Sequence, residues 1–392
     1  MKKLVSLLLI VMLAMTSASA LAGAYDPDYT MAAEGTVLQD VADRNITPAA
    51  GALDINPVIE GESPVTGLPL AEGRYMPVLV QITNPEGLVK IDGKNVTAAG
   101  IGERAPWGGQ YADIVYEGIL YRTGQTRITF LFSDSLVDGL PTSAGPVRSA
   151  RIGHVLLREE WQGGIAFAGG PRRPGNNIFD TFKELGANDK GVVFNLLDNG
   201  YESVSNRVSD LPGPENLNVN PAGIQALIPE TTVAEPHPFL FADLCPYLEG
   251  YELAYTINLD WGHSKYISHF YYDETTNLYL RYSGDAPYMT SANSEDRSEE
   301  NQEQMAFSNV IIQRVGYDYA NGNSTMPLMR AVGQGNADIF IGGRYIPGYW
   351  VRESETSPTV FLDDQGNELV LTRGTTFIAH FPPESLLTFS GL

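Results

Sequence analysis

The hydrophobic pattern of the first half of the chain mixes strand and helix periodicities. Two segments have apolar positions spaced as on one face of a helix, residues 152–161 and 178–185. Four segments have the alternation or the short apolar runs of strands, residues 76–83, 127–133, 163–168 and 192–197. Residues 112–121 fit either pattern. Strands and helices in this order predict a layered α/β domain.

The second half has almost only strand patterns. They cover residues 252–258, 266–272, 278–282, 310–315, 337–341, 349–351 and 376–381. Residues 359–362 and 368–371 flank a polar turn at 363–367, which predicts a hairpin. A Pro- and Asn-rich stretch at 211–235 marks the boundary. The expected fold class is α+β, with a layered α/β N-terminal domain over 63–235 and a mainly antiparallel β C-terminal domain over 236–392.

The start of the chain has the pattern of a secretory signal peptide. Lys2 and Lys3 precede an apolar run at 4–15, and small residues follow it at 18–22. We expect cleavage after Ala20 or Ala22, so residues 1–22 are the signal peptide. Residues 23–62 are rich in Ala, Gly, Pro and acids, which favours a flexible leader. No other segment is apolar for long enough to form a transmembrane helix.

Charge and cysteine content restrict the possible partners. The formal net charge is −22, and removal of a signal with two lysines and no acid leaves −24. Such a surface repels nucleic acid, so we expect no nucleic-acid partner. Cys245 is the single cysteine, and no basic neighbour in the sequence would activate its thiol. We therefore expect neither a disulfide nor a cysteine nucleophile.

The sharpest functional signal is a set of arginines. Arg148 and Arg151 lie where a predicted loop enters the helix at 152–161, and Arg172 follows the next strand. Guanidinium groups at a helix start suit a carboxylate or a phosphate. The alternative is that Arg148 and Arg151 pair with Asp113 and Glu117 in a buried structural network. The ligand-binding candidates are Glu117, Arg127, Arg148, Arg151 and Arg172.

Catalysis is a second hypothesis. Asp113 and Glu117 are four residues apart and share a face on either a helix or a strand, so they could act as acid and base. His154 follows Arg151 by one helical turn and could serve as a base. No spacing of His, Cys, Asp or Glu matches a metal site, and no glycine-rich loop matches a nucleotide site. We expect neither a metal nor a cofactor.

Several segments together resemble a known family. They are residues 64–69, 112–117, 126–129, 145–151 (Gly-Pro-Val-Arg-Ser-Ala-Arg), 309–313 and 333–335. The pattern is similar to that of the YerB-like lipoproteins, which consist of the N- and C-terminal parts of DUF3048, a domain of unknown function. The resemblance implies export and a two-part layout. Members of the family usually carry a lipid-modified cysteine, which is missing here, so we expect a secreted or extracytoplasmic protein without a lipid anchor.

Three functions follow from this sequence. The first is an exported cell-envelope or extracellular module that binds an anionic small molecule or a cell-wall fragment. The second is a hydrolase or transferase that acts on envelope polymers with Asp113 or Glu117. The third is a scaffold for other proteins.

Overall fold

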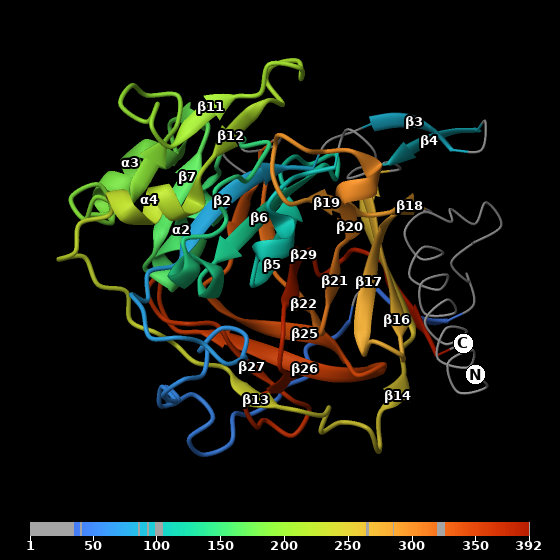
Figure 1. The fold of residues 1–392 in the computed structure, drawn as a ribbon. Coiled ribbons are helices and arrows are strands. Elements are labelled where there is room, and N and C mark those ends of the chain that lie inside the picture. Colours follow the sequence, from blue (N-terminus) through green and yellow to red (C-terminus); the bar gives the residue numbers. More distant parts are fainter. Residues whose placement is uncertain are drawn as a thin grey trace, which may run out of the picture.

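The computed structural model describes residues 35–39, 41–84, 87–91, 94–98, 105–263, 266–284, 286–319 and 326–391. The predicted signal peptide lies outside these ranges. Within them the protein is mostly β, with two large sheets, six two-stranded sheets and three α-helices. Strands dominate both halves, so the helical layers expected for 63–235 are a smaller part of the protein than the sequence pattern suggested (Figure 1).

The larger sheet has eleven strands and contains both halves of the chain. β5 of the first half and β29 of the second half are its parallel central neighbours. Its order is β10 (Val193–Asn195), β7 (Gly164–Phe167), β2 (Val78–Thr83), β6 (Thr126–Phe132), β5 (Ile114–Ile119), β29 (Thr376–Phe381), β22 (Asn309–Arg314), β25 (Gly333–Ile341), β26 (Arg344–Arg352) and β14 (Glu252–Leu253), with β27 (Val360–Leu362) on β26.

The second sheet is antiparallel and covers one face of the first. It consists of β1 (Thr36–Leu38), β30 (Leu387–Ser390), β15 (Thr256–His263), β16 (Tyr266–Asp273), β17 (Leu278–Ser283), β18 (Ala286–Pro287) and β21 (Ala306–Phe307). Aromatic rings join the two sheets: Phe270 lies 4.8 Å from Phe377, and Trp261 lies 4.8 Å from Phe381, between ring centroids. This face of β29 therefore points into the space between the sheets.

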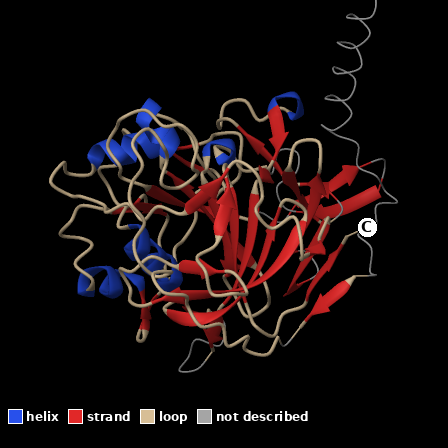
Figure 2. Cartoon of the chain, turned by 90° about the horizontal axis from the view of Figure 1, so that it is seen from below, coloured by secondary structure: helices blue, strands red, loops and turns tan. Residues whose placement is uncertain are grey.

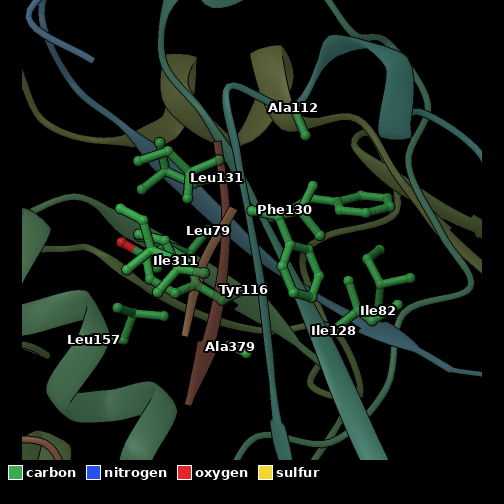
Figure 3. Packing of buried hydrophobic residues seen from close by; sticks show 14 of the residues in the cluster. Leu79, Ile82, Ala112, Tyr116, Ile128, Phe130, Leu131, Leu157, Ile311 and Ala379 are labelled. Carbon is green, nitrogen blue, oxygen red and sulfur yellow. The ribbon is translucent and has the colours of Figure 1, made fainter. Parts of the chain in front are cut away.

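The opposite face of the large sheet packs against α2 (Ile152–Trp161). Along β5 and β6 successive side chains alternate between the two faces. Figure 3 shows Tyr116 and Leu157 on one side of the strands, and Ile128 and Phe130 on the other. All seven residues of β6 are buried, because both faces of the sheet are covered.

The remaining helices lie with α2 beside β7 and β2, at one end of the molecule (Figures 1 and 2). They are α3 (Ile178–Glu184) and α4 (Pro221–Leu227). The 3₁₀ turns within the described residues are η2 (Gly109–Tyr111), η3 (Asp134–Asp138) and η4 (Glu299–Asn301). The sequence predicted α2 and α3 but not α4. The sequence nevertheless has the residues that typically begin a helix at the start of α4. The Asn220 side chain accepts a hydrogen bond from Gly223 N, and Pro221 is the first helical residue.

The small sheets are two-stranded. They are β3 (Gly87–Ile91) with β4 (Lys94–Ala98), β8 (Arg172–Arg173) with β9 (Asn176–Asn177), β11 (Ser205–Arg207) with β12 (Leu217–Val219), β13 (Leu240–Ala242) with β28 (Val370–Thr372), β19 (Met289–Ser291) with β20 (Gln302–Gln304), and β23 (Gly316–Asp318) with β24 (Leu328–Arg330). The turn predicted at 363–367 is present, but β27 and β28 on its two sides belong to different sheets.

The described part of the predicted flexible leader is folded against the second half. β1 pairs with β30, and the Arg44 guanidinium donates to the buried carboxylate of Asp338 and, over 2.9 Å, to Tyr345 OH. Arg314 binds the other oxygen of Asp338 at 2.7 Å. The composition that suggested flexibility did not reveal that Arg44 completes a buried charge network.

Candidate functional site

The Gly145–Arg151 loop extends the large sheet at one edge. β7 pairs with β2 only as far as Val80. Beyond that point the loop takes the place of β7: Thr83 N donates to Pro146 O, and Arg148 N donates to Gln81 O. The continuation of β7 then binds the outer side of the loop, because Ala168 N donates to Arg148 O. The loop is thus a fixed part of the sheet edge.

Three arginines meet at this edge. β2, β7, β5 and β29 are parallel, so their carboxyl ends lie on the same side of the sheet. β6 runs the other way, so Arg127 near its start faces that same edge, opposite Thr83 and Gly118. Arg148 and Arg151 arrive from the loop. Ligands commonly bind beyond the carboxyl ends of such strands.

None of the three arginines has a carboxylate partner in the described part of the chain. Arg127 is 4% exposed, and its Nε and Nη1 are buried without a hydrogen bond. The Nε atoms of Arg148 and Arg151 are also buried and unpaired. Arg151 donates only to neutral groups: Ser149 Oγ at 3.0 Å, Ala150 O at 2.8 Å and Tyr121 OH at 3.3 Å. The cluster therefore has uncompensated positive charge.

The clustering of buried positive charge has its largest effect on the pKa of Arg127. Burial, and then the charges of Arg151 and Arg148, lower the pKa of Arg127 to about 9. Burial likewise lowers the pKa of Arg151. Arginine stays charged in proteins, so these shifts show that the clustered positive charge is unfavourable. A bound anion would compensate this positive charge.

His154 adds a neutral hydrogen-bond donor. Its Nδ1 accepts a 2.9 Å hydrogen bond from Arg151 N at the start of α2. Burial, and then the charges of Arg127 and Arg151, lower the pKa of His154 well below its usual range, so the ring is neutral. With Nδ1 as acceptor, the proton is on Nε2. This neutral donor does not raise the repulsion within the cluster.

A pocket lies against this cluster at the junction of the two halves. Gly118 permits the close approach of Tyr317, whose OH would lie 3.2 Å from a Cβ atom at position 118. Tyr317 is held there because its OH donates to His380 O over 2.8 Å. The principal lining residues are Arg127, Arg151, His154, Tyr317, Met329 and His380.

Glu117 belongs to a different site from the arginines. It pairs across β6 with Ile128 and so points to the opposite face of the sheet from Arg127. Its carboxylate accepts from Arg281 at 2.7 Å and Ser268 at 2.9 Å on the second sheet, and from Thr126 at 2.6 Å. Glu117 is 1% exposed, and its four hydrogen bonds, completed by Asn84, join the two sheets.

Asp113 is also structural. Its Oδ2 accepts from Ser133 N at 2.6 Å and Asp134 N at 3.0 Å, which fixes the turn after β6. Burial, and then the charge of Asp134, raise its pKa well above the usual range. Four strand residues separate Asp113 from Glu117 by about 13 Å, too far for one acid–base pair. The predicted ion pairs of these two carboxylates with Arg148 and Arg151 are wrong.

Arg172 does not join the cluster. It is exposed on β8, and its guanidinium stacks 3.6 Å above the ring of Phe179. Tyr121, Tyr317 and His380 do contribute to the site but were not among the candidates. His380 is next to the end of a predicted strand, and Tyr121 ends the segment 112–121, which fitted either a helix or a strand. These positions were the available signal. The strand that holds Tyr317 was not predicted at all.

Two kinds of feature are absent from the described part of the chain. No group of three His, Cys, Asp or Glu side chains is gathered there as a metal site would require. No helix in the same ranges has the length and apolar character needed to cross a membrane.

Family models for the "protein of unknown function (DUF3048)" match both parts of this chain. The N-terminal domain model covers residues 66–234 and the C-terminal domain model covers residues 257–378. The chain therefore belongs to the DUF3048 family. The arginine loop and Arg127 lie in the N-terminal domain, whereas Tyr317 lies in the C-terminal one.

A solved structure with this fold is the YerB protein from Bacillus subtilis. It matches with a TM-score of 0.63 and 22% sequence identity, over 82% of this chain and 96% of that one. At this identity the likeness concerns the fold. No curated protein matches the chain.

Proposed function

We propose that this protein binds a small anionic ligand, bearing a carboxylate or a phosphate, between Arg127, Arg148 and Arg151. The observation that carries the proposal is the absence of a carboxylate partner for these arginines within the described residues, although other buried arginines have one. Arg158, Arg281, Arg314 and Arg352 are each paired with an acidic side chain. Like charges held together unpaired reduce stability, which is typical of a site whose partner is a ligand.

The donors present favour an anion that accepts several hydrogen bonds. Arg127 and Arg148 have unused N–H groups, and guanidinium groups bind carboxylate or phosphate in bidentate geometry. His154 offers Nε2–H, and the start of α2 adds the partial positive charge of a helix N-terminus. A phosphate has enough oxygens to accept from all of them.

The proposal is a binding function rather than a reaction. The hydrolase or transferase hypothesis needed Asp113 or Glu117 beside Arg148 and Arg151. Glu117 is fully engaged on the far face of the sheet, and Asp113 holds a turn. Of the two histidines near the arginines, His154 uses its basic nitrogen for Arg151 N, and burial lowers the pKa of His380 to about 3.

Thermal unfolding with added anions tests the proposal. Inorganic phosphate, sulfate and acetate are compared with chloride at equal ionic strength. We expect phosphate to raise the melting temperature of the wild-type protein, because a ligand that binds only the folded state stabilises it. Arg127→Met should abolish the shift. Arg172→Gln is the matched control, and it should keep the shift. An equal shift in wild type and Arg127→Met would reject the site.

We further propose that binding takes place outside the cytoplasm. The charged, apolar and small-residue segments of 1–22 support export. Mass spectrometry of the protein recovered from its producing cells measures the mature N-terminus. We expect it to begin at Leu21 or Gly23 without a lipid. Retention of Met1 together with residues 2–22 in a cytoplasmic fraction would contradict the proposal.

A further inference from the structure

A second pocket lies at the opposite end of α2 from the arginines. The helix is ten residues long, which separates its ends by about 15 Å. The pocket is a hollow that is partly open to solvent. Five segments of the chain form its walls: residues 53–56, the end of α2, residues 237–239, residues 358–360, and Glu368.

Glu368 presents an available carboxylate to this pocket. Its Oε1 accepts a 2.7 Å hydrogen bond from Asn56 Nδ2, and its Oε2 has no hydrogen-bond partner in the described part of the chain. Glu160 differs, because its two oxygens bind Arg352 Nη1 and Thr359 N, each at 2.9 Å. Asp54 adds a second acid at the exposed rim. The pocket lining contains no lysine or arginine.

His237 supplies an unused acceptor. Both of its imidazole nitrogens are buried, and neither has a hydrogen-bond partner among the described residues. Burial lowers the pKa of His237, so the ring is neutral and one nitrogen carries a lone pair. A buried polar atom without a partner costs about 1–3 kcal/mol. A ligand that donates a hydrogen bond would remove this cost.

The other walls are apolar and aromatic. Trp161 and Phe239 meet edge to face with ring centroids 6.3 Å apart. The Trp161 indole N–H already donates to Tyr116 OH at 2.9 Å, so the ring offers this pocket only apolar surface. Pro238, Pro358 and Leu53 complete the lining. Aromatic surface beside an acid suits an organic cation.

We propose that this pocket binds a small organic cation, namely a primary ammonium group on an apolar or aromatic body. The ammonium group donates to Glu368 Oε2 and to the free nitrogen of His237. The body of the ligand lies against Trp161 and Phe239. The net charge of −22 attracts such a cation from a distance. This site is independent of the anion site, because the two share no lining residue.

Binding should depend on pH through Glu368. Burial raises the pKa of Glu368 to about 7. The other charged or titratable groups that line the same pocket are Asp54, Glu160 and His237, and Arg352 is paired with Glu160. The carboxyl group is ionised in about nine-tenths of the molecules at pH 8 and in about one-tenth at pH 6. A cation that needs the ionised form should bind about tenfold more tightly at pH 8.

The test uses 2-phenylethylammonium as the probe, with neutral 2-phenylethanol and anionic phenylacetate of similar shape. Saturation-transfer NMR gives the dissociation constant of each at pH 6 and pH 8. We expect the ammonium probe to bind most tightly, and about tenfold better at pH 8. Glu368→Gln keeps the acceptor for Asn56, and it should weaken ammonium binding about tenfold and remove its pH dependence.

Two control variants locate the effect. Asp54→Asn at the exposed rim should change the dissociation constant less than twofold. Arg127→Met should leave it unchanged, which separates this site from the anion site. Equal binding of 2-phenylethanol and the ammonium probe would overturn the proposal, and so would the absence of binding at both pH values. Unchanged binding by a folded Glu368→Gln protein would also overturn it.

Discussion

Replacing Arg127 with methionine should make the ligand-free protein more stable. Most substitutions of buried side chains destabilise a protein. Arg127 is different, because it is 4% exposed, has no acidic partner within the described residues, and lies beside two other arginines. Methionine fills a similar volume, is flexible, and carries no charge.

The size of the effect follows from the pKa of Arg127. A reduction from 12.5 to about 9 corresponds to roughly 5 kcal/mol of unfavourable free energy for the charged form. Part of this is regained by relaxation and by water, so we expect a gain of about 1–3 kcal/mol in the free energy of unfolding, as found when buried charges are replaced by apolar groups. For a chain of this length that raises the melting temperature by about 1–4 °C.

Chemical denaturation at pH 7 in phosphate-free buffer measures the difference. Arg281→Met is the matched control, because Arg281 is equally buried but paired with Glu117 at 2.7 Å. Loss of Arg281 leaves the buried carboxylate of Glu117 without its ion-pair partner, and it should lower the free energy of unfolding by about 3–5 kcal/mol. A destabilised Arg127→Met protein would refute the reasoning.

Three other substitutions follow from the same contacts. Glu117→Gln should lower the free energy of unfolding by about 3–5 kcal/mol in denaturant titrations while phosphate still binds the folded protein, because it unpairs Arg281 on the far face of the sheet. His154→Ala should cost about 1 kcal/mol by the same measurement, since it removes the acceptor for Arg151 N at the start of α2. Burial raises the pKa of the partly exposed Glu368 carboxyl to about 7, so between pH 4.5 and pH 7 the folded protein binds more protons than the unfolded protein. The free energy of unfolding of the wild type should therefore fall by about 1 kcal/mol as the pH rises through this range. Glu368→Gln should not show this decrease. A wild-type stability that rises with pH across this window would contradict the last of these.

Local patterns were enough to predict much of the fold. The strands around Ile128 and Val80 and the helix that starts at Ile152 were predicted within about two residues, because their apolar periodicity is clear. The strand character of residues 114–119 was not decided by the pattern, since buried strands covered on both faces lose their alternation. The single sheet that joins both halves could not be predicted either. It depends on the pairing of β5 with β29, more than 250 residues apart in the sequence.

The candidate site was predicted in part. Arg127, Arg148 and Arg151 meet at one sheet edge, as their positions next to strand ends and a helix start suggested. The partner of Glu117 could not be predicted, because it depends on strand register. A shift of one residue between β5 and β6 would have placed Glu117 on the arginine face. Instead it faces Arg281, whose strand was predicted but whose packing partner was not.

The unfolding free energies of wild-type and Arg127→Met protein, compared across a phosphate titration, test the central claim most directly. Without phosphate, the variant should be the more stable protein. With rising phosphate, wild-type stability should increase with the logarithm of the concentration, whereas the variant should not respond, so the two curves cross. Parallel curves, or a wild-type protein that is more stable at every concentration, would show that the arginine cluster is structural and not an anion site.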